Sequence, residues 1–249
     1  MIRRPRSLTA PRLGAVLLAT LWLSGCATTQ QDGLESDADP ERAAKLNVAM
    51  GIEYMEQGNL SRARSKLEHA LAIDPGNADA LQANALLYQR QGENQLAREF
   101  FERALAAEPD LTRARNNYAA FLYRQGEIAA ACEQLKRASQ DIHYDNRAQL
   151  FTNLGRCQLE RGALADAAES LERAQNIDPR HAPSYLALAR TLTAQGEYDR
   201  AWDQLQRFIR LAGTPPESLR LAEQIASARG DGASAAFYSR QLKESQRAP

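Results

Sequence analysis

Residues 78–109 of this chain read ADALQANALLYQRQGENQLAREFFERALAAEP, and this stretch decides the fold. It contains two helical patterns on either side of Gly92, with a small residue at Ala97, a bulky one at Phe101 and a closing Pro109. Proline ends a helix because it lacks an amide hydrogen and restricts the residue before it. The stretch therefore predicts a pair of helices joined by a short turn.

The same pattern recurs through most of the chain. Six glycines mark it at intervals of 34 or 36 residues: Gly58, Gly92, Gly126, Gly162, Gly196 and Gly230. Each is followed five positions later by alanine and, in the first five copies, four positions further on by a bulky apolar residue; the sixth has Ser239 there. The preceding helix carries a small residue where two helices must approach closely, at Gly51, Ala85, Ala119, Gly155 and Ala189. Small residues permit this contact and large ones fill the gaps.

This pattern resembles the tetratricopeptide repeat over about residues 44–245. The resemblance implies an all-α solenoid of about six helix-turn-helix repeats forming a right-handed superhelix. The expected repeats are 44–77, 78–111, 112–147, 148–181, 182–215 and 216–245. Repeat three carries two extra residues near Asp141 to Asn146. Repeat six departs from the repeat pattern, as expected of a terminal capping repeat whose outer face meets water. Such arrays bind other polypeptides and rarely catalyse reactions.

A targeting segment precedes the array. Four arginines (Arg3, Arg4, Arg6 and Arg12) come before an apolar run from Leu13 to Leu23, which is too short to span a bilayer. The run ends in Leu23-Ser24-Gly25-Cys26, which resembles the bacterial lipobox. That resemblance implies a signal peptide over residues 1–25 and a covalent lipid on Cys26. The alternative is an ordinary signal peptide with an incidental cysteine.

The residues after this cysteine suggest a tether and a destination. Residues 26–43 are rich in Thr, Gln, Asp, Ser and Glu, so we expect a lipidated flexible tether. Ala27, in place of aspartate, favours the outer membrane by resemblance to sorted lipoproteins. We therefore expect a lipid-anchored protein on the periplasmic face of that membrane.

Composition argues against several classes of function. Without residues 1–25 the chain holds 27 basic and 31 acidic side chains, which gives no basic stripe for nucleic acid. Glycine-rich phosphate loops and the common hydrolase motifs are missing from the sequence, so no enzyme, small-molecule substrate or non-covalent cofactor is expected. The three histidines, His69, His143 and His181, lie in different repeats without ligand spacing, so we expect no metal site.

Two cysteines remain within the array. Cys132 falls in the second helix of repeat three and Cys157 in the first helix of repeat four. Because consecutive helices of an array pack together, the two sulfurs could form a disulfide worth about 3 kcal/mol in an oxidising compartment. The alternative is two buried free thiols that act as small hydrophobic groups.

Partner-binding residues are expected on the first helix of each repeat, at positions not needed for packing. These positions are Lys45, Val48, Ile52, Met55 and Glu56 in repeat one; Asp79, Gln82, Leu86, Gln89 and Arg90 in repeat two; and Arg113, Asn116, Ala120, Tyr123 and Arg124 in repeat three. The spacing of Val48, Ile52 and Met55 predicts an exposed apolar notch for an amphipathic helix or an extended segment. The alternative is that the tether or a preceding turn covers the notch.

Repeat three carries the most specific resemblance. Residues 115–123 read RNNYAAFLY, and Asp141 and Tyr144 lie in the inserted segment. These features resemble the type IV pilus biogenesis and stability lipoproteins, the PilF/PilW-type pilotins; Ala119 stands where their motif often has glycine. The Asn116-Asn117 pair has two interpretations, a local one beside the inserted turn and a direct contact with the partner.

The resemblance implies a function. Pilotins bind the secretin, the multimeric channel of the pilus, and promote its outer-membrane localisation and multimerisation. Two alternatives are also repeat-containing lipoproteins: an adaptor for outer-membrane barrel-protein assembly, and an adaptor for a cell-wall enzyme.

Overall fold

The computed structural model describes residues 39–246. The expected signal peptide, the lipidation site at Cys26 and most of the expected tether lie outside the described residues. Within residues 39–246, no helix combines the length and apolar character needed to cross a bilayer.

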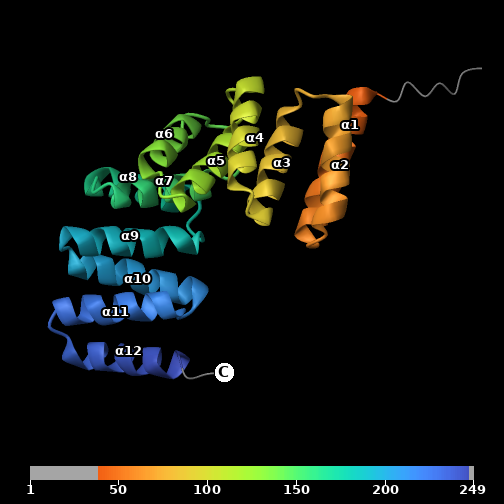
Figure 1. Cartoon of the computed structure of the whole chain (residues 1–249). Helices are drawn as coiled ribbons and strands as arrows, with labels where there is room; N and C mark the ends of the chain where they lie inside the picture. Colours follow the sequence, from red (N-terminus) through yellow and green to blue (C-terminus); the bar gives the residue numbers. More distant parts are fainter. Residues whose placement is uncertain (1–38, 247–249) are drawn as a thin grey trace, which may run out of the picture. The chain divides into compact units, whose positions relative to one another are not determined.

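The described residues form helices joined by short connections, which confirms the all-α repeat fold (Figure 1). The helices are α1 (Pro40–Glu56), α2 (Leu60–Ile73), α3 (Ala78–Gln91), α4 (Asn94–Ala107), α5 (Thr112–Arg124), α6 (Ile128–Ala138), α7 (Arg147–Glu160), α8 (Leu164–Ile177), α9 (Ala182–Gln195), α10 (Tyr198–Ala212), α11 (Pro216–Ala228) and α12 (Gly232–Ser245). Odd-numbered helices are the first helices of repeats one to six, and even-numbered helices are the second.

Helix α1 begins earlier than expected. The tether was expected to extend to residue 43, but the helix starts at Pro40. Proline is well suited to the first position of a helix, because its missing amide hydrogen would have no partner there. Glu41 in the first turn also complements the helix dipole and pairs with Lys45 at 2.5 Å.

The regular spacing of the six repeat glycines has a conformational cause. All six repeat glycines have left-handed backbone, with φ between +74° and +80°. At Gly92, for example, the amide nitrogens of Gly92 and Glu93 donate to the carbonyls of Gln89 and Tyr88, which closes the end of α3. Glycine adopts this conformation without the steric penalty that a Cβ atom brings.

The small and large positions of the repeat meet as expected. A Cβ atom added to Gly51 would lie 2.6 Å from Leu67 Cδ2, and one added to Gly155 would lie 2.5 Å from Leu171 Cγ. Leu67 and Leu171 are completely buried. The glycines thus let the two helices of a repeat approach closely, while the leucines fill the space between them.

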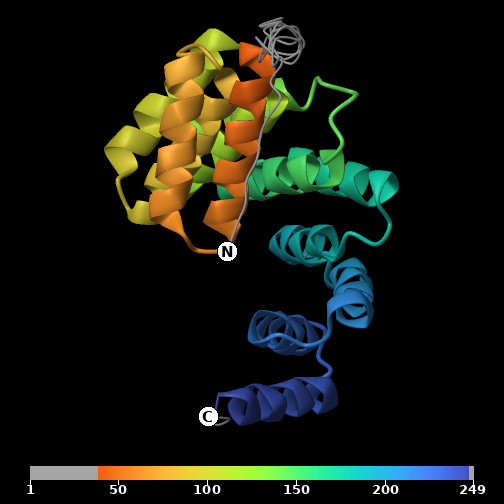
Figure 2. The same ribbon diagram turned by 90° about the vertical axis from the view of Figure 1, so that its right-hand side faces the viewer.

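Contacts between repeats are unequal on the two sides of the array. The Cα atoms of each first helix come within 8 Å of those of the next first helix. In residues 40–245, successive second helices have no Cα atoms this close and meet through side chains, as Gln175 and Gln204 do. Figure 2 shows the helices from α9 to α12 following one another along the array. The first helices therefore lie side by side along one surface, which we call the first-helix face.

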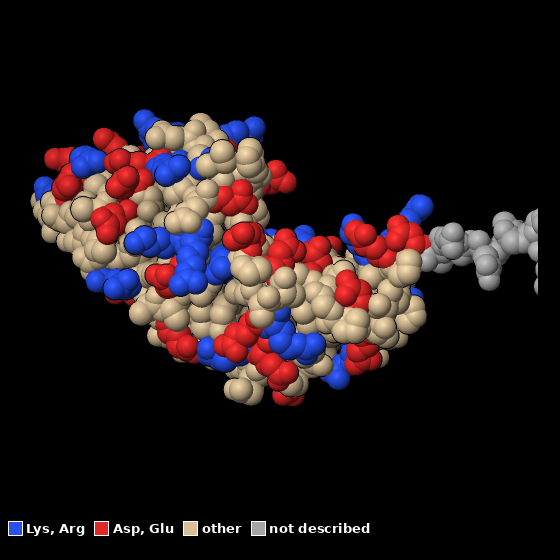
Figure 3. All heavy atoms as spheres, turned by 90° about the horizontal axis from the view of Figure 1, so that it is seen from above, with Lys and Arg blue, Asp and Glu red and all other residues tan. Residues whose placement is uncertain are grey.

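Charges of both signs are spread over the surface. In the view of Figure 3, acidic and basic side chains are interspersed over the array. Some of them pair between adjacent repeats, as do Arg98 with Glu127 and Arg200 with Glu172. Exposed pairs of this kind contribute only about 0–1 kcal/mol each, so the apolar contacts between helices hold the array together.

Candidate partner-binding face

The helix position that Val48 occupies in repeat one was expected to bind a partner. In repeats one to five, the side chain at this position is buried from solvent. Its occupants are Val48, Gln82, Asn116, Thr152 and Leu186, and all are 7 % exposed or less. Packing against the neighbouring first helix removes this position from solvent. The prediction that Val48 is exposed is therefore wrong.

The apolar notch predicted in repeat one is filled by repeat two. Val48 and Met55, 6 % and 3 % exposed, belong to a core cluster with Ala83 and Leu87 of α3. Ile52 is only half-buried against the same cluster. Neither the tether nor a preceding turn is needed to cover Val48 and Met55, because α3 does so. Of the expected positions in this repeat, Lys45 is exposed and pairs with Glu41.

Several expected binding positions of repeats two and three instead connect the repeats. Leu86 is half-buried between two core clusters. Arg90 donates to the backbone carbonyl of Met55. Arg113 pairs with Asp79 and donates through Nε to Gln82 Oε1 at 3.2 Å. These side chains fix the packing of adjacent repeats, which the sequence pattern alone did not separate from partner binding.

Asn116 has a local role beside the inserted segment. Its Oδ1 accepts from Nδ2 of Asn153 on α7 at 3.0 Å, and its side chain is also hydrogen-bonded to Tyr144. Asp141 accepts from Thr112 Oγ1 at 2.7 Å, so the inserted segment is bonded to α5 at two points. Of the two interpretations of Asn116, the structure favours the local one, because this side chain is 7 % exposed and already bonded.

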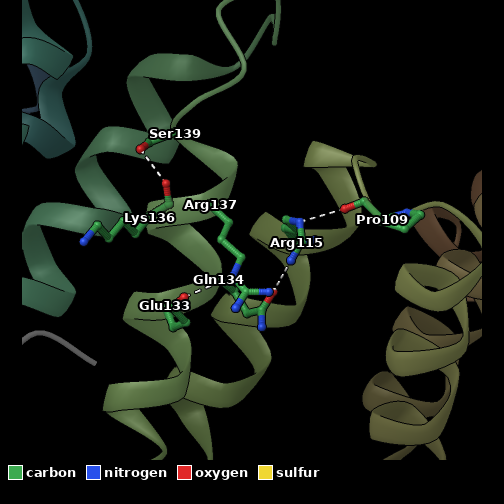
Figure 4. A network of polar contacts seen from close by, with 7 residues as sticks. All are labelled: Pro109, Arg115, Glu133, Gln134, Lys136, Arg137 and Ser139. Carbon is green, nitrogen blue, oxygen red and sulfur yellow. Dashed lines mark hydrogen bonds and ion pairs between the residues drawn. The ribbon is translucent and has the colours of Figure 1, made fainter.

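Arg115, which precedes this asparagine, anchors the other side of α5 (Figure 4). Its Nε donates to the carbonyl of Pro109 at 2.9 Å, and its Nη1 donates to Gln134 Oε1 on α6 at 2.7 Å. Arg137 pairs with Glu133 on the same helix. The start of the RNNYAAFLY motif therefore holds α5 between the preceding loop, α6, the inserted segment and α7.

A disulfide joins repeats three and four. The structure places Cys132 of α6 and Cys157 of α7 with their sulfurs bonded and their Cα atoms 5.6 Å apart. This separation lies in the usual range for disulfides. The bond crosses the inserted segment, where the connection between repeats is longest, and so limits the relative motion of α6 and α7.

The first-helix face is open farther along the array. A cleft of about 270 Å³ lies between α5 and α7 and is lined by Tyr123, Arg124, Asn153 and Arg156, over Ala119, Ala120 and Leu135. An adjoining cleft of about 300 Å³ extends to α9 and the start of α11, where its lining includes Leu186, Arg190 and Glu217. Tyr123 and Arg156 line both clefts. The two clefts of this face therefore lie at repeats three to six, and Tyr123 lies where they adjoin.

Tyr123 is held by charged neighbours on α7. Its hydroxyl donates to Glu160 Oε1 at 3.3 Å, and the guanidinium carbon of Arg156 lies 5.8 Å from its ring centre. Partial burial, followed by the charge of Glu160, raises the pKa of Tyr123, and Arg156 opposes this shift. The phenol therefore remains neutral at physiological pH and presents an apolar ring with a polar tip to the two clefts.

Two arginines of this face were missed by the sequence analysis. Arg156 and Arg190 occupy, in repeats four and five, the position that Ile52, Leu86 and Ala120 occupy in repeats one to three. Applying the repeat period beyond repeat three would have identified them. The same helix position thus changes from apolar to cationic along the array.

Comparison with known proteins agrees with this architecture. The tetratricopeptide-repeat family matches residues 48–110, 82–145 and 158–225. The type IV pilus assembly protein PilF of Pseudomonas aeruginosa is 34 % identical over 233 residues, which cover 93 % of this chain and 92 % of PilF. The chain belongs to the PilF-type family of type IV pilus biogenesis proteins.

Solved structures of this family have the same fold. The PilF structure from Pseudomonas aeruginosa matches with a TM-score of 0.76 and 33 % identity, over 83 % of this chain and 93 % of that chain. PilW, described as a widely conserved type IV pilus biogenesis factor, matches with a TM-score of 0.74 and 28 % identity, over 81 % and 92 %. YrrB, a repeat protein with an unusual peptide-binding site, matches at 20 % identity with a TM-score of 0.59 and shares the fold alone.

Proposed function

We propose that this protein is a pilotin, an outer-membrane lipoprotein that binds the type IV pilus secretin and promotes its localisation and multimerisation. The observation that carries the proposal is the relationship to PilF over more than nine-tenths of both chains. The alignment of 233 residues is longer than the described part of the array, so it includes some of the segment in which we expect the lipid anchor.

The mechanism requires two parts of the chain. Acyl chains on Cys26 would hold the protein to the membrane, since each buried methylene contributes about 0.8 kcal/mol and several chains together bind almost permanently. The array would hold an unassembled secretin subunit at the same membrane and raise its local concentration there. No chemical step is needed, because assembly follows from concentration and orientation.

We propose a contact farther along the array than repeat one. The sequence pointed to repeat one, but Val48 and Met55 are covered by α3. The open clefts instead flank Tyr123, an expected binding residue that lines both of them. We therefore assign the secretin contact to the first-helix face of repeats three to six.

A pull-down from detergent-solubilised membranes, followed by mass spectrometry, tests this function. The full-length lipidated protein should co-purify with the secretin, and its deletion should reduce secretin multimers and twitching motility. A Cys26→Ser variant should leave the outer-membrane fraction and lose secretin assembly there. Co-purification of the barrel-protein insertase or a cell-wall hydrolase in place of the secretin would replace the proposal with one of the two alternative adaptors.

A further inference from the structure

The cleft between α5 and α7 combines an apolar floor with a cationic rim. Ala119 and Leu135 form part of the floor and are 0 % and 2 % exposed. Arg124 and Arg156 lie at its edge and are exposed. Among residues 39–246, no carboxylate forms an ion pair with either guanidinium.

This lack of internal pairing distinguishes the two arginines from others on the same face. Arg113 pairs with Asp79 of repeat two, and Arg190 pairs with Glu217 of α11 at 2.7 Å. Those two charges are largely neutralised by the protein itself. The α5–α7 cleft therefore carries two guanidinium groups without an ion-pair partner among residues 39–246, beside apolar surface.

The rim is partly preorganised. The guanidinium of Arg156 lies against the ring of Tyr123, which restricts its position. Asn153, on the same wall, donates to Asn116 and accepts from Gln149 Nε2 at 2.8 Å, so its amide is held within the protein. The guanidinium groups are thus the main polar anchors that remain for a ligand.

We propose that this cleft binds a peptide segment that carries a carboxylate side chain next to an apolar one. The apolar side chain packs over Ala119 and Leu135, and the carboxylate accepts hydrogen bonds from Arg124 and Arg156. Arginine suits this task because its planar guanidinium matches carboxylate geometry. Glu160, across Tyr123 in the adjoining cleft, repels a second carboxylate and so orients the segment. This assignment deepens the proposed function. It rests on that function only for the identity of the protein that contains the peptide, which would be the secretin.

Immobilised peptides can test the chemistry without the secretin. The full-length lipidated protein in detergent is applied to three matched sets, in which leucine neighbours aspartate or glutamate, asparagine or glutamine, or lysine. The acidic set should bind, and added salt should weaken its binding. Equal binding of the neutral set, or no binding of the acidic set, would overturn the proposal.

Charge-removing variants locate the site. Arg156→Gln and Arg124→Gln should each weaken binding of the acidic set about tenfold, the effect expected from losing one charge-assisted hydrogen bond. Arg207→Gln is the matched control, because Arg207 is exposed on α10, a second helix, and should change nothing. Unchanged binding by the double variant Arg124→Gln with Arg156→Gln would show that the peptide binds elsewhere.

Membrane pull-downs with the same double variant separate the two proposals. If the original protein captures the secretin and the double variant does not, both proposals are supported. If the original protein selects acidic peptides but never captures the secretin, the cleft assignment stands and the pilotin function fails. If both capture the secretin equally, the function stands and the cleft assignment is overturned.

Discussion

In repeat one, Val48 is covered by α3 and Ile52, one turn later on the same helix, is half-buried; in repeat four, the equivalent positions are Thr152 and Arg156. Thr152 is as closed to solvent as Val48, but Arg156 is exposed at the edge of two clefts. Burial therefore follows the position within the repeat. Chemistry at the accessible position is free to differ, and here it changes from apolar to cationic.

This difference suggests separate tasks for the two regions. In repeat one, the first-helix face contributes to packing and stability. In repeats three and four, the disulfide joins α6 to α7, the inserted segment is bonded to α5, and Asn153 of α7 is bonded to Asn116 of α5. The side chains above this framework remain open. A rigid framework below accessible side chains favours binding, because less conformational entropy is lost when the partner docks.

The strongest test of this comparison replaces Val48 with aspartate. A carboxylate without a cationic partner in the core should lower the free energy of unfolding by about 3 kcal/mol or more. Ile52→Asp, on the same helix but partly exposed, should cost about 1 kcal/mol. Hydrogen exchange of α1 and α3 would measure both effects. Equal, small effects would mean that Val48 is accessible and would restore the notch expected in repeat one.

Loss of the disulfide should have the next largest effect, now in repeats three and four. Replacing both Cys132 and Cys157 with alanine should lower stability by about 3 kcal/mol, because the bond restrains the unfolded chain. A reductant should lower the melting temperature of the original protein toward that of the double variant and leave the variant unchanged. If both thiols react with an alkylating agent before any reductant is added, the bond is not formed in the protein.

Gly51 and Gly155 occupy the same packing position in repeats one and four, so substitution by alanine can be compared between them. An alanine Cβ at Gly155 would lie 2.5 Å from Leu171 Cγ and 3.0 Å from the backbone oxygen of Ala167, whereas at Gly51 the nearest backbone oxygen, that of Ala63, lies at 3.5 Å. Gly155→Ala should therefore destabilise the protein by about 1–2 kcal/mol. Gly51→Ala should be closer to neutral, because Leu67 can shift and alanine favours the helix by about 1 kcal/mol. Urea denaturation of both variants would measure the difference, and a larger loss at Gly51 would contradict it.

Two tyrosines of α5 provide the smallest test. Burial, and then the hydrogen bond to Glu102 and the charge of that carboxylate, raise the pKa of Tyr118 from 10.0 to about 12. The unfolded chain therefore loses this proton first, so the stabilising contribution is complete below about pH 10 and is lost as pH rises toward about 12. Tyr118→Phe should reduce the alkaline loss of stability.

Melting temperatures of the original protein and the Tyr118→Phe variant across this pH range would measure the effect. Tyr123→Phe is the matched change at the clefts. The pKa of Tyr123 is raised in the same direction, so this variant should also reduce the alkaline loss. The two tyrosines differ in environment, since Tyr118 is in the core and 6 % exposed, whereas Tyr123 lies at the cleft between α5 and α7. An unchanged alkaline slope in Tyr118→Phe would show that its phenol ionises as easily in the folded protein as in the unfolded chain.

Some features of the binding face could be read from single residues and others could not. Tyr123 was expected on this face and lies there, half-buried against the core of repeat three and lining both clefts. Val48 and Met55 were misplaced because an apolar residue on α1 can face either a partner or α3, and the spacing along one helix is the same in both cases. Asn116 was ambiguous for a related reason, since only the position of Tyr144 and Asn153 shows that its amide is already bonded.

The sequence by itself determined the helix pairs, their turns and their order, because each depends on contacts within about 34 residues that recur in phase. Tertiary structure decided which first-helix positions remain accessible, because that depends on how each repeat is rotated against the next. It also decided that Arg124 and Arg156 lack an internal carboxylate partner among the described residues, while Arg113 and Arg190 have one. Pairing between repeats depends on distances across the array, which the spacing of residues along the chain does not specify.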